Sequence, residues 1–175
     1  YMFREVARVP AGAGAPPEPI QANRANLCMW WCYYTHLTNI QIQPRQTGKS
    51  LCADFLQVEQ LNFRAVNTPH NLYTKSDDLR RENITRIKQI LDSLPRWMDM
   101  RSKKDTNNGE GITINALGNR LNTHLPRASE KDAEKVGRGF TSPTNFYDEL
   151  PFQTWVAKAY PASMSSMDAA KERAI

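Results

Sequence analysis

The sequence predicts an α/β fold with a mainly parallel sheet flanked by helices, and three observations lead to this prediction. Short segments of alternating or continuous apolar residues are separated by longer segments with apolar residues at helical spacing, which is the pattern of β-α-β units. The chain has 175 residues, of which 40% are hydrophobic and 23% charged, so it is long enough to bury a core. No apolar run approaches the ~18 residues of a membrane-spanning helix, so we expect no membrane partner.

The charge and the cysteines indicate the environment of the protein. The net charge is +5, and the excess of basic residues falls within residues 1–104, which is compatible with a polyanionic partner. The three cysteines are an odd number without the spacing of a disulfide framework, so we expect free thiols in a reducing compartment.

The first third of the chain predicts an arm, two helices and a strand. Residues 1–19 are expected to form an N-terminal arm or linker, because residues 10–19 contain four prolines. Residues 21–36 predict a helix, and residues 39–43 alternate between polar residues and isoleucine, which indicates a short strand. A second helix is expected over residues 49–62. The apolar face of the first helix would consist of Leu27, Trp30, Trp31 and Tyr34.

The middle of the chain contains the most regular helical pattern. Residues 64–67 indicate a second strand. Residues 76–94 carry an apolar stripe at helical spacing, and Pro95 ends the expected helix. Residues 112–116 and 120–125 surround a Leu-Gly-Asn turn and predict a β-hairpin that is inserted into the fold.

The last third of the chain predicts one more strand between two helical segments. Residues 129–136 predict a short helix that begins with Ser-x-x-Asp, which resembles a capping box. Residues 144–147 indicate the third strand. From Pro151 onward the chain is expected to be mostly helical, with an interruption at Pro161.

The strongest functional signal is the segment Gln-Pro-Arg-Gln-Thr-Gly-Lys-Ser at residues 43–50. A tight loop between a strand and a helix turns its backbone N–H groups inward, and the helix points its positive end at the same place, so the loop would bind phosphate. Lys49 would reach the β- and γ-phosphates, the Ser50 hydroxyl would coordinate Mg²⁺, and Gly48 would let the backbone approach closely. Position 43 is Gln where the full motif has Gly, so an ordinary strand–turn–helix is the alternative.

A pair of acids follows the last expected strand. Nucleotide hydrolysis needs one carboxylate near the metal and a second one to orient or deprotonate water. Asp148 would hold Mg²⁺ through its water shell, and Glu149 would be the general base. The alternative is a solvated strand end, where Asp-Glu pairs are common.

Together these motifs resemble the ATPase domain of the large terminase subunit of tailed bacteriophages, the DNA-packaging motor. The resemblance covers residues 20–155 and rests on Pro-Arg-Gln-Thr-Gly-Lys-Ser (44–50), Gly-Arg-Gly-Phe-Thr (137–141) and Asp-Glu-Leu-Pro-Phe (148–152). The Arg-Gln-x-Gly-Lys-Ser form of the loop is characteristic of that family and explains the missing first glycine. The resemblance implies a P-loop NTPase-type ATPase domain over residues 20–175, in a truncated form without the coupling motif and the nuclease domain of the family.

The resemblance also implies roles for individual residues. Gln21 resembles the glutamine that reads the adenine edge, and Arg45 resembles the loop arginine that contacts phosphate. Arg138 resembles the arginine that acts on the nucleotide of a neighbouring subunit, and its glycine neighbours favour an exposed, reaching side chain. Catalytic roles thus fall to Glu149, Arg138 and Arg45. The nucleotide-binding positions are Gln21, Pro44, Arg45, Gln46, Thr47, Gly48, Lys49 and Ser50.

The implied activity is ATP hydrolysis, with Mg²⁺ as cofactor, that powers translocation of double-stranded viral DNA into a procapsid. The implied partners are double-stranded DNA, further copies of the chain in a homo-oligomeric ring (a pentamer), the portal protein and the small terminase subunit. The implied location is the host cell cytoplasm, with transient docking on the viral procapsid. Two alternatives stay open: a helicase-like or other P-loop ATPase or phosphotransferase, and a non-catalytic module that binds nucleotide only as a structural ligand.

Overall fold

The computed structural model describes residues 5–11, 14–125, 131, 135 and 142–173. These residues fall into two compact units. The first unit contains Tyr1–Gln60 and Thr85–Asp99, and the second contains Leu61–Ile84 and Met100–Ile175. The chain passes between the units after Gln60, within helix α3 (Asp77–Asp92) and after Asp99. Within the described part of the chain, no helix combines the length and the apolar composition that crossing a membrane requires.

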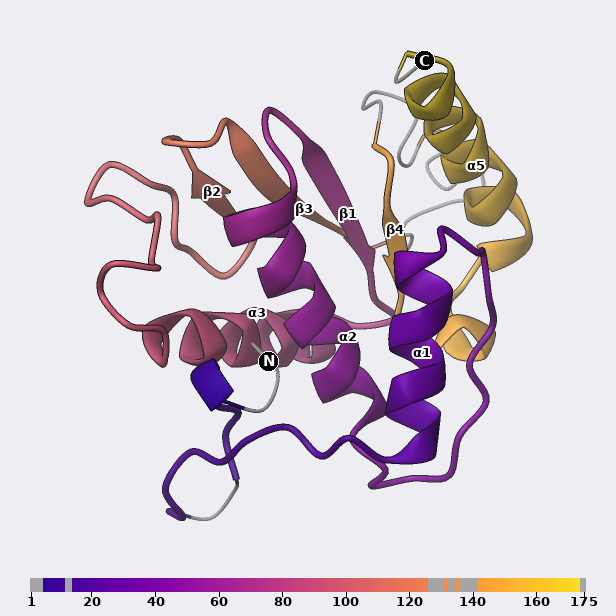
Figure 1. Cartoon of the computed structure of the whole chain (residues 1–175). Helices are drawn as coiled ribbons and strands as arrows, with labels where there is room; N and C mark the ends of the chain where they lie inside the picture. The colour runs from indigo at the N-terminus through magenta and orange to yellow at the C-terminus, as the bar shows by residue number, and fades with distance from the viewer. Residues whose placement is uncertain (1–4, 12–13, 126–130, 132–134, 136–141, 174–175) are drawn as a thin grey trace. The chain divides into compact units, whose positions relative to one another are not determined.

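The first unit is built around two contacting helices, α1 (Arg24–Tyr34) and α2 (Lys49–Glu59), which confirm the two helices expected in this region (Figure 1). The Asn23 side chain accepts a hydrogen bond from the backbone N–H of Asn26 and so caps the start of α1. The Tyr33 hydroxyl donates to Glu59 Oε2 at 3.2 Å and joins the two helices. Core side chains from α2 and from the second half of α3 are fully buried: Cys52, Phe55, Val58, Ile87, Ile90 and Leu91.

The N-terminal residues are tied to the first unit. Val9 and Glu18 form an antiparallel bridge with N···O distances of 2.8 and 3.0 Å, and the Arg8 backbone N–H donates to Ser93 Oγ at 2.9 Å. Val9 and Ile20 are buried. The described part of the expected arm is therefore anchored by backbone hydrogen bonds. The expected boundary between an arm of residues 1–19 and an ATPase domain of residues 20–175 stays a prediction.

Two expectations for the first unit were wrong. Residues 39–43 form a loop and no strand, and the exposed fractions of Ile40 and Ile42 are 76% and 93%. Alternation predicts a strand only where a partner strand buries one face, and the described sheet forms without this segment. The buried face of α1 also differs from the expected one. Of the expected residues Trp30 is buried, together with Met29 on the side that carries Tyr33, whereas Leu27, Trp31 and Tyr34 are 49%, 61% and 39% exposed.

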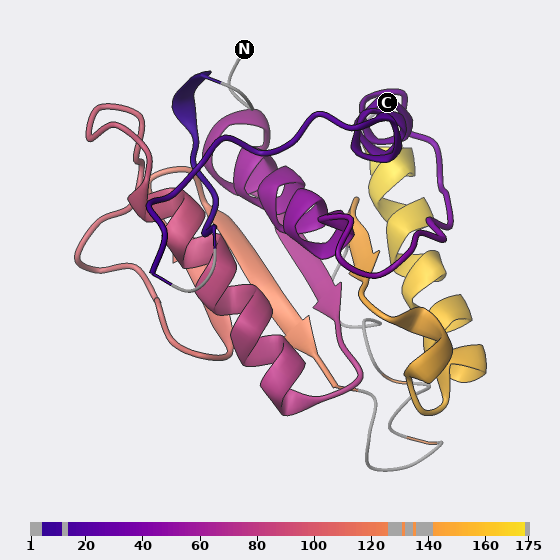
Figure 2. The same cartoon turned by 90° about the horizontal axis from the view of Figure 1, so that it is seen from below.

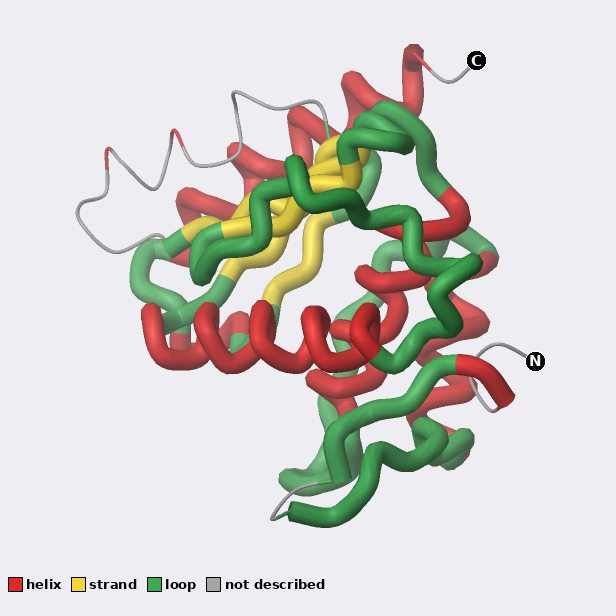
Figure 3. The backbone as a smooth tube through the Cα atoms, turned by 90° about the vertical axis from the view of Figure 1, so that its left-hand side faces the viewer, coloured by secondary structure: helices red, strands yellow, loops and turns green. Residues whose placement is uncertain are grey.

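The second unit contains a four-stranded sheet of order β2-β3-β1-β4. Its strands are β1 (Pro69–Tyr73), β2 (Gly111–Ile114), β3 (Asn119–His124) and β4 (Asn145–Tyr147). Strand β1 pairs in parallel with both β3 and β4, and β2 pairs antiparallel with β3. The strands are the yellow segments of Figure 3. The structure thus confirms a mixed α/β fold with a mainly parallel sheet and flanking helices.

The hairpin forms where it was expected, but it is part of the main sheet. Strand β3 lies between β2 and β1, so the expectation of an inserted hairpin was wrong. At the turn, Gly118 has a φ of 68°, and a Cβ there would lie 3.1 Å from Asn67 Oδ1. The turn therefore needs glycine for its conformation and for the close approach of Asn67.

The expected strand over residues 64–67 is absent, because α2 continues into a π-helical turn at Gln60–Arg64. The buried Asn119 side chain ends this helical segment. Its Nδ2 donates to the backbone carbonyl oxygens of Leu61 and Ala65 at 2.8 and 2.6 Å, and its Oδ1 accepts from the Thr68 N–H at 3.0 Å. This long-range cap satisfies the free groups of the helix end and starts β1 at Pro69.

The helices of the second unit follow the remaining predictions with one exception. Ser76 caps α3, because the Leu79 N–H donates to Ser76 Oγ at 3.2 Å. A 3₁₀ turn (Leu150–Phe152) precedes α5 (Val156–Arg173), which lies beside β4 (Figure 2). Helix α5 runs through Pro161, so the expected interruption was wrong, although an interior proline removes one backbone hydrogen bond and crowds the preceding turn. The expected helix over residues 129–136 lies outside the described residues, apart from the helical Lys131 and Lys135.

Candidate functional site

Residues 43–48 of the first unit form a tight loop that leads directly into α2. Gln46 and Gly48 have positive φ angles of 62° and 78°, and Gly48 immediately precedes the helix. The Gly48 carbonyl accepts the first hydrogen bond of α2 from the Cys52 N–H at 2.8 Å. Backbone that alternates between left- and right-handed regions gathers successive N–H groups on one side, which is a conformation suited to anions.

The side chain of Gln43 closes this loop at the position where the full phosphate-loop motif has glycine. The Thr47 hydroxyl lies 2.9 Å from Gln43 Oε1 and 3.1 Å from the Pro44 carbonyl oxygen. The hydroxyl can donate to either acceptor, so Gln43 supports the turn through its side chain. The sequence pattern treated this glutamine only as a departure from the motif.

The start of α1 lies beside the loop. Asn23 Nδ2 donates to the Thr47 carbonyl at 3.2 Å, and Asn26 Nδ2 donates to the Gln21 carbonyl at 2.8 Å. Asn26 is buried, and a Cβ at Gly48 would lie 3.8 Å from its Nδ2. The structure therefore brings Gln21 to the same region as the loop. Sequence reasoning missed both asparagines, because the loop that they adjoin is not a near neighbour of α1 in the sequence.

The polar side chains of the loop are accessible. Pro44, Arg45 and Gln46 are exposed, and Lys49 and Ser50 are half-buried. No ion pair joins Lys49 to a side chain in the described part of the chain. The ammonium group is thus available to an anionic ligand.

In the second unit, Asp148 is held firmly at the end of β4. Its N–H donates to the Tyr73 carbonyl at 3.0 Å and continues the pairing of β4 with β1. Its Oδ2 accepts from Nδ2 of the buried Asn83 at 3.1 Å. The buried Gln153 side chain donates to the carbonyl oxygens of both Asp148 and Tyr73, at 2.9 and 3.0 Å. Neither Asn83 nor Gln153 carries a signal in the sequence that would have identified it.

Glu149 leaves the strand in a left-handed conformation, with φ 54° and ψ 44°. Its carboxylate forms an ion pair with the Lys75 ammonium, and both side chains are about one-third exposed. The Lys75 Nζ also lies 5.2 Å from the centroid of the Phe152 ring. Lys75 was not expected at the site, because it is far from Glu149 in sequence.

A polar and aromatic row crosses one face of the sheet next to these acids. In the parallel register, Asn71 lies between Asn122 and Asn145, and Tyr73 lies between His124 and Tyr147. Asn71 Nδ2 donates to Asn145 Oδ1 at 2.9 Å, and the three rings stack at centroid distances of 4.9 and 4.3 Å.

Burial widens the pH range over which His124 and Tyr147 in this row are electrically neutral. It lowers the pKa of His124 to about 4 and raises the pKa of Tyr147 to about 12. The neutral His124 places Nε2 3.1 Å from Asn71 Oδ1, to which it can donate. The Tyr147 hydroxyl is hydrogen-bonded to the Ser163 hydroxyl of α5. These contacts fix the end of β4 and therefore the position of Asp148.

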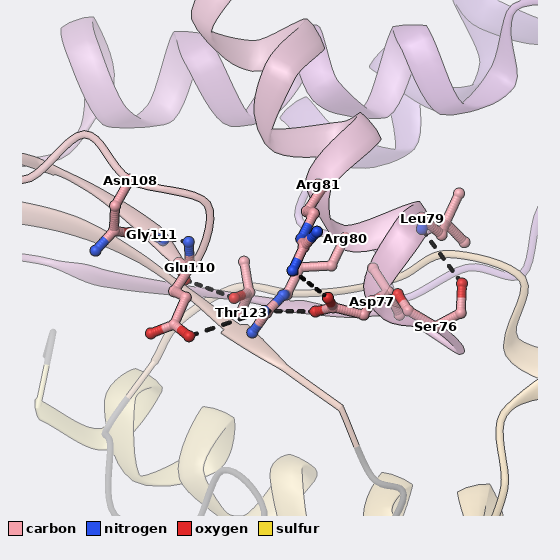
Figure 4. A network of polar contacts seen from close by, with 10 residues as sticks. Ser76, Asp77, Leu79, Arg80, Arg81, Asn108, Glu110, Gly111 and Thr123 are labelled. Atoms are coloured by element: carbon pink, nitrogen blue, oxygen red, sulfur yellow. Dashed lines mark hydrogen bonds and ion pairs between the residues drawn. The ribbon is translucent and has the colours of Figure 1, made fainter.

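A charged network holds the start of α3, close to Lys75 in the sequence (Figure 4). Asp77 pairs with Arg80 at 2.5 Å and with Arg81 at 2.9 Å, and Arg80 lies 3.9 Å from Glu110. The Thr123 hydroxyl at the end of β3 donates to the Glu110 carbonyl at 2.5 Å. Both arginines thus have carboxylate partners, and the network fixes the helix that carries Asn83.

The expected site residues therefore fall into two groups, each of which is assembled within its own unit. Gln21 and residues 44–50 come together in the first unit, and Asp148 and Glu149 lie at the end of β4 in the second. Arg138 lies outside the described residues. Within the described part of the chain, no three His, Cys, Asp or Glu side chains gather in a group that could hold a metal ion. Mg²⁺ commonly binds through one or two protein oxygens together with phosphates, so the Ser50 hydroxyl and the Asp148 carboxylate have suitable chemistry.

All three cysteines are free thiols, as expected. Burial raises the pKa of Cys52 to about 12, so its thiol is protonated and unreactive at neutral pH.

Comparison with known proteins does not add a family to these observations: no protein-family model matches the chain, and no curated protein matches it either.

Proposed function

We propose that this protein hydrolyses Mg²⁺-ATP and uses the free energy to translocate double-stranded viral DNA into a procapsid, as the ATPase domain of a large terminase subunit does. The observation that carries the proposal is the loop before α2. Gln46 and Gly48 have left-handed backbone conformations immediately before the N-terminus of α2, and Lys49 is the first residue of this helix. Such a loop combines N–H groups, a helix dipole and an ammonium group in one place.

The roles of the loop residues follow from their chemistry. Backbone N–H groups of residues 45–48 would bind the phosphate oxygens, and Lys49 would neutralise charge on the β- and γ-phosphates. The Ser50 hydroxyl would be a ligand of Mg²⁺, which when bound neutralises charge that develops on the phosphates. Gln21, anchored through Asn26, would read the adenine edge with its amide group.

The acids at the end of β4 would supply the remaining chemistry. Asp148 is oriented by Asn83 and by two backbone hydrogen bonds, so its carboxylate is suited to hold a metal-bound water. Glu149 would accept a proton from the water that attacks the γ-phosphate. Its side chain is about one-third exposed and its backbone is left-handed.

Translocation of DNA is the part of the proposal that rests on the resemblance and on the basic excess of residues 1–104. In that scheme, copies of the chain form a ring, and Arg138 of one copy would act on the nucleotide of the next. The portal protein and the small terminase subunit would be the packaging partners, in the host cell cytoplasm.

A non-catalytic nucleotide-binding module is the second candidate, and one observation favours it. The proposed general base, Glu149, is engaged by Lys75. A protein that only binds nucleotide could keep this ion pair permanently. Multiple-turnover ATP hydrolysis, measured with and without duplex DNA, separates the two functions: the ATPase turns over and responds to DNA, whereas the module does not.

The phosphate-loop assignment is tested by nucleotide affinity. Lys49→Ala should weaken binding of Mg²⁺-ATP at least tenfold, because one cation that faces the phosphates is lost. Lys103→Ala, in an exposed loop, is the matched control and should bind like the wild type. Isothermal titration calorimetry measures both. An unchanged affinity of Lys49→Ala would remove the phosphate-loop assignment and the proposed function with it.

A further inference from the structure

Lys75 has a fixed backbone position between β1 and α3. On one side, the N–H of the buried Thr74 donates to the His124 carbonyl at 3.1 Å and extends the β1–β3 pairing. On the other side, Ser76 caps α3. Lys75 therefore projects from a rigid connection at the carboxyl end of a parallel strand, the edge at which α/β sheets bind ligands.

The partner of Lys75 comes from a much less regular segment. Glu149 is left-handed, and its carbonyl accepts from the Phe152 N–H at 2.9 Å to form the 3₁₀ turn. Trp155, at the end of the same segment, also has a positive φ of 61°. Left-handed conformations of non-glycine residues are unfavourable and collect at functional sites. Lys75 thus contacts both the carboxylate and the Phe152 ring of a strained turn that directly follows Asp148.

The ion pair is weak enough to be exchanged. Both side chains are partly exposed, and solvent screening limits such pairs to an equilibrium bias of no more than about fivefold. A phosphate oxygen accepts the same charge-assisted hydrogen bond as a carboxylate oxygen, so it can compete for the same ammonium. The rigid side of the contact is Lys75 and the adaptable side is Glu149, so loss of the pair would free the carboxylate to move.

We infer that Lys75 is a positioning residue for Glu149: it holds this carboxylate in a resting arrangement and releases it when a phosphate oxygen takes its place on the ammonium group. The inference rests on the proposed ATPase function. It adds a regulatory step, because Glu149 accepts the proton of the attacking water only after the exchange. The phosphate comes either from the nucleotide or from the DNA backbone.

The exchange is measurable without any catalysis, by the rate at which an amine-acylating reagent modifies Lys75 in the full 175-residue chain. Mass spectrometry follows Lys75 relative to the exposed control Lys103. Glu149→Gln removes the carboxylate charge and should raise the labelling rate of Lys75 by about two- to fivefold. Addition of Mg²⁺-ATP alone, or of a short DNA duplex alone, should return this rate to the wild-type level, and the ligand that does so identifies the source of the phosphate.

Two results would overturn the inference: the same Lys75 labelling rate in wild type and Glu149→Gln, or no protection of Lys75 by a ligand whose binding is demonstrated by calorimetry. The proposed function fails separately, if Mg²⁺-ATP does not bind to the wild type or if Lys49→Ala binds it unchanged.

Steady-state kinetics provide the catalytic readout. If DNA supplies the phosphate, Lys75→Met should raise the DNA-free kcat by about two- to fivefold, leave KM for ATP unchanged and abolish stimulation by duplex DNA. If the nucleotide supplies it, Lys75→Met should raise KM for ATP. Lys75→Arg keeps the charge and should restore wild-type behaviour in either case. Unchanged kcat, KM and DNA stimulation in Lys75→Met would contradict the positioning role.

Discussion

Replacement of Gly48 by alanine tests whether the conformation of the loop, and no other property of this position, supports phosphate binding. Gly48 has a φ of 78°, and a Cβ there would meet only Asn26 Nδ2 at 3.8 Å, an ordinary contact. Space is therefore available, and the cost of the substitution is conformational. An L-residue in the left-handed region is less stable by about 1–2 kcal/mol. If the loop must keep this conformation to bind ATP, the affinity should fall by about 5- to 30-fold.

Gly14 offers a matched control, since it has nearly the same φ, 79°, and a Cβ would meet nothing within 4 Å. It lies in the same unit but outside the phosphate loop. Calorimetry with Mg²⁺-ATP and denaturant unfolding should be measured on both variants. Gly14→Ala should change stability at most and bind ATP like the wild type, whereas Gly48→Ala should lose affinity. Wild-type affinity in Gly48→Ala would refute the argument that the left-handed residue shapes the binding loop.

Two further predictions concern stability. Asn119→Ala should lower the free energy of unfolding by about 2–4 kcal/mol, because it leaves two carbonyl groups and one N–H without their partner. Replacement of the exposed Asn115 by alanine is the control. Equal denaturation midpoints for Asn119→Ala and Asn115→Ala would contradict the capping role. Burial lowers the pKa of His70 to about 4, below the ordinary 6.5, so the unfolded chain binds the proton more readily and stability should fall as the pH drops from 6.5 to 4. His70→Asn should reduce this pH dependence, measured by urea unfolding at several pH values, and the exposed His36→Asn should not.

The sequence was sufficient to predict features that depend on near neighbours. The helical stripe of residues 76–94, the glycine of the hairpin turn and the glycine before α2 follow from local periodicity and backbone conformation. Residues 39–43 show the limit of such patterns. Alternation states which residues share a face, but it does not state whether a partner strand covers that face, and here the isoleucines are exposed.

Contacts between distant segments could not be predicted in this way. Asn119 ends a helical segment that lies 54 or more residues earlier in the chain, and this cap moves the start of β1 from the expected residues 64–67 to Pro69. The same limit applies to the candidate site. Asp148 and Glu149 were identified from their types and spacing, whereas Asn83 and Lys75 became visible only when the sheet brought their elements together. A lysine or an asparagine between two elements has no local signature.

The central claim, that the chain is an ATPase with Glu149 as its base, is tested most directly by single-turnover hydrolysis of Mg²⁺-ATP with protein in excess. The assay should compare the wild type, Glu149→Gln and the exposed control Glu82→Gln. Glu149→Gln has a nearly isosteric amide that cannot accept the proton of water, so it should bind Mg²⁺-ATP and fail to release phosphate. The wild type and Glu82→Gln should hydrolyse the bound nucleotide. Equal phosphate release by the wild type and Glu149→Gln, with ATP binding verified in both, would contradict the account.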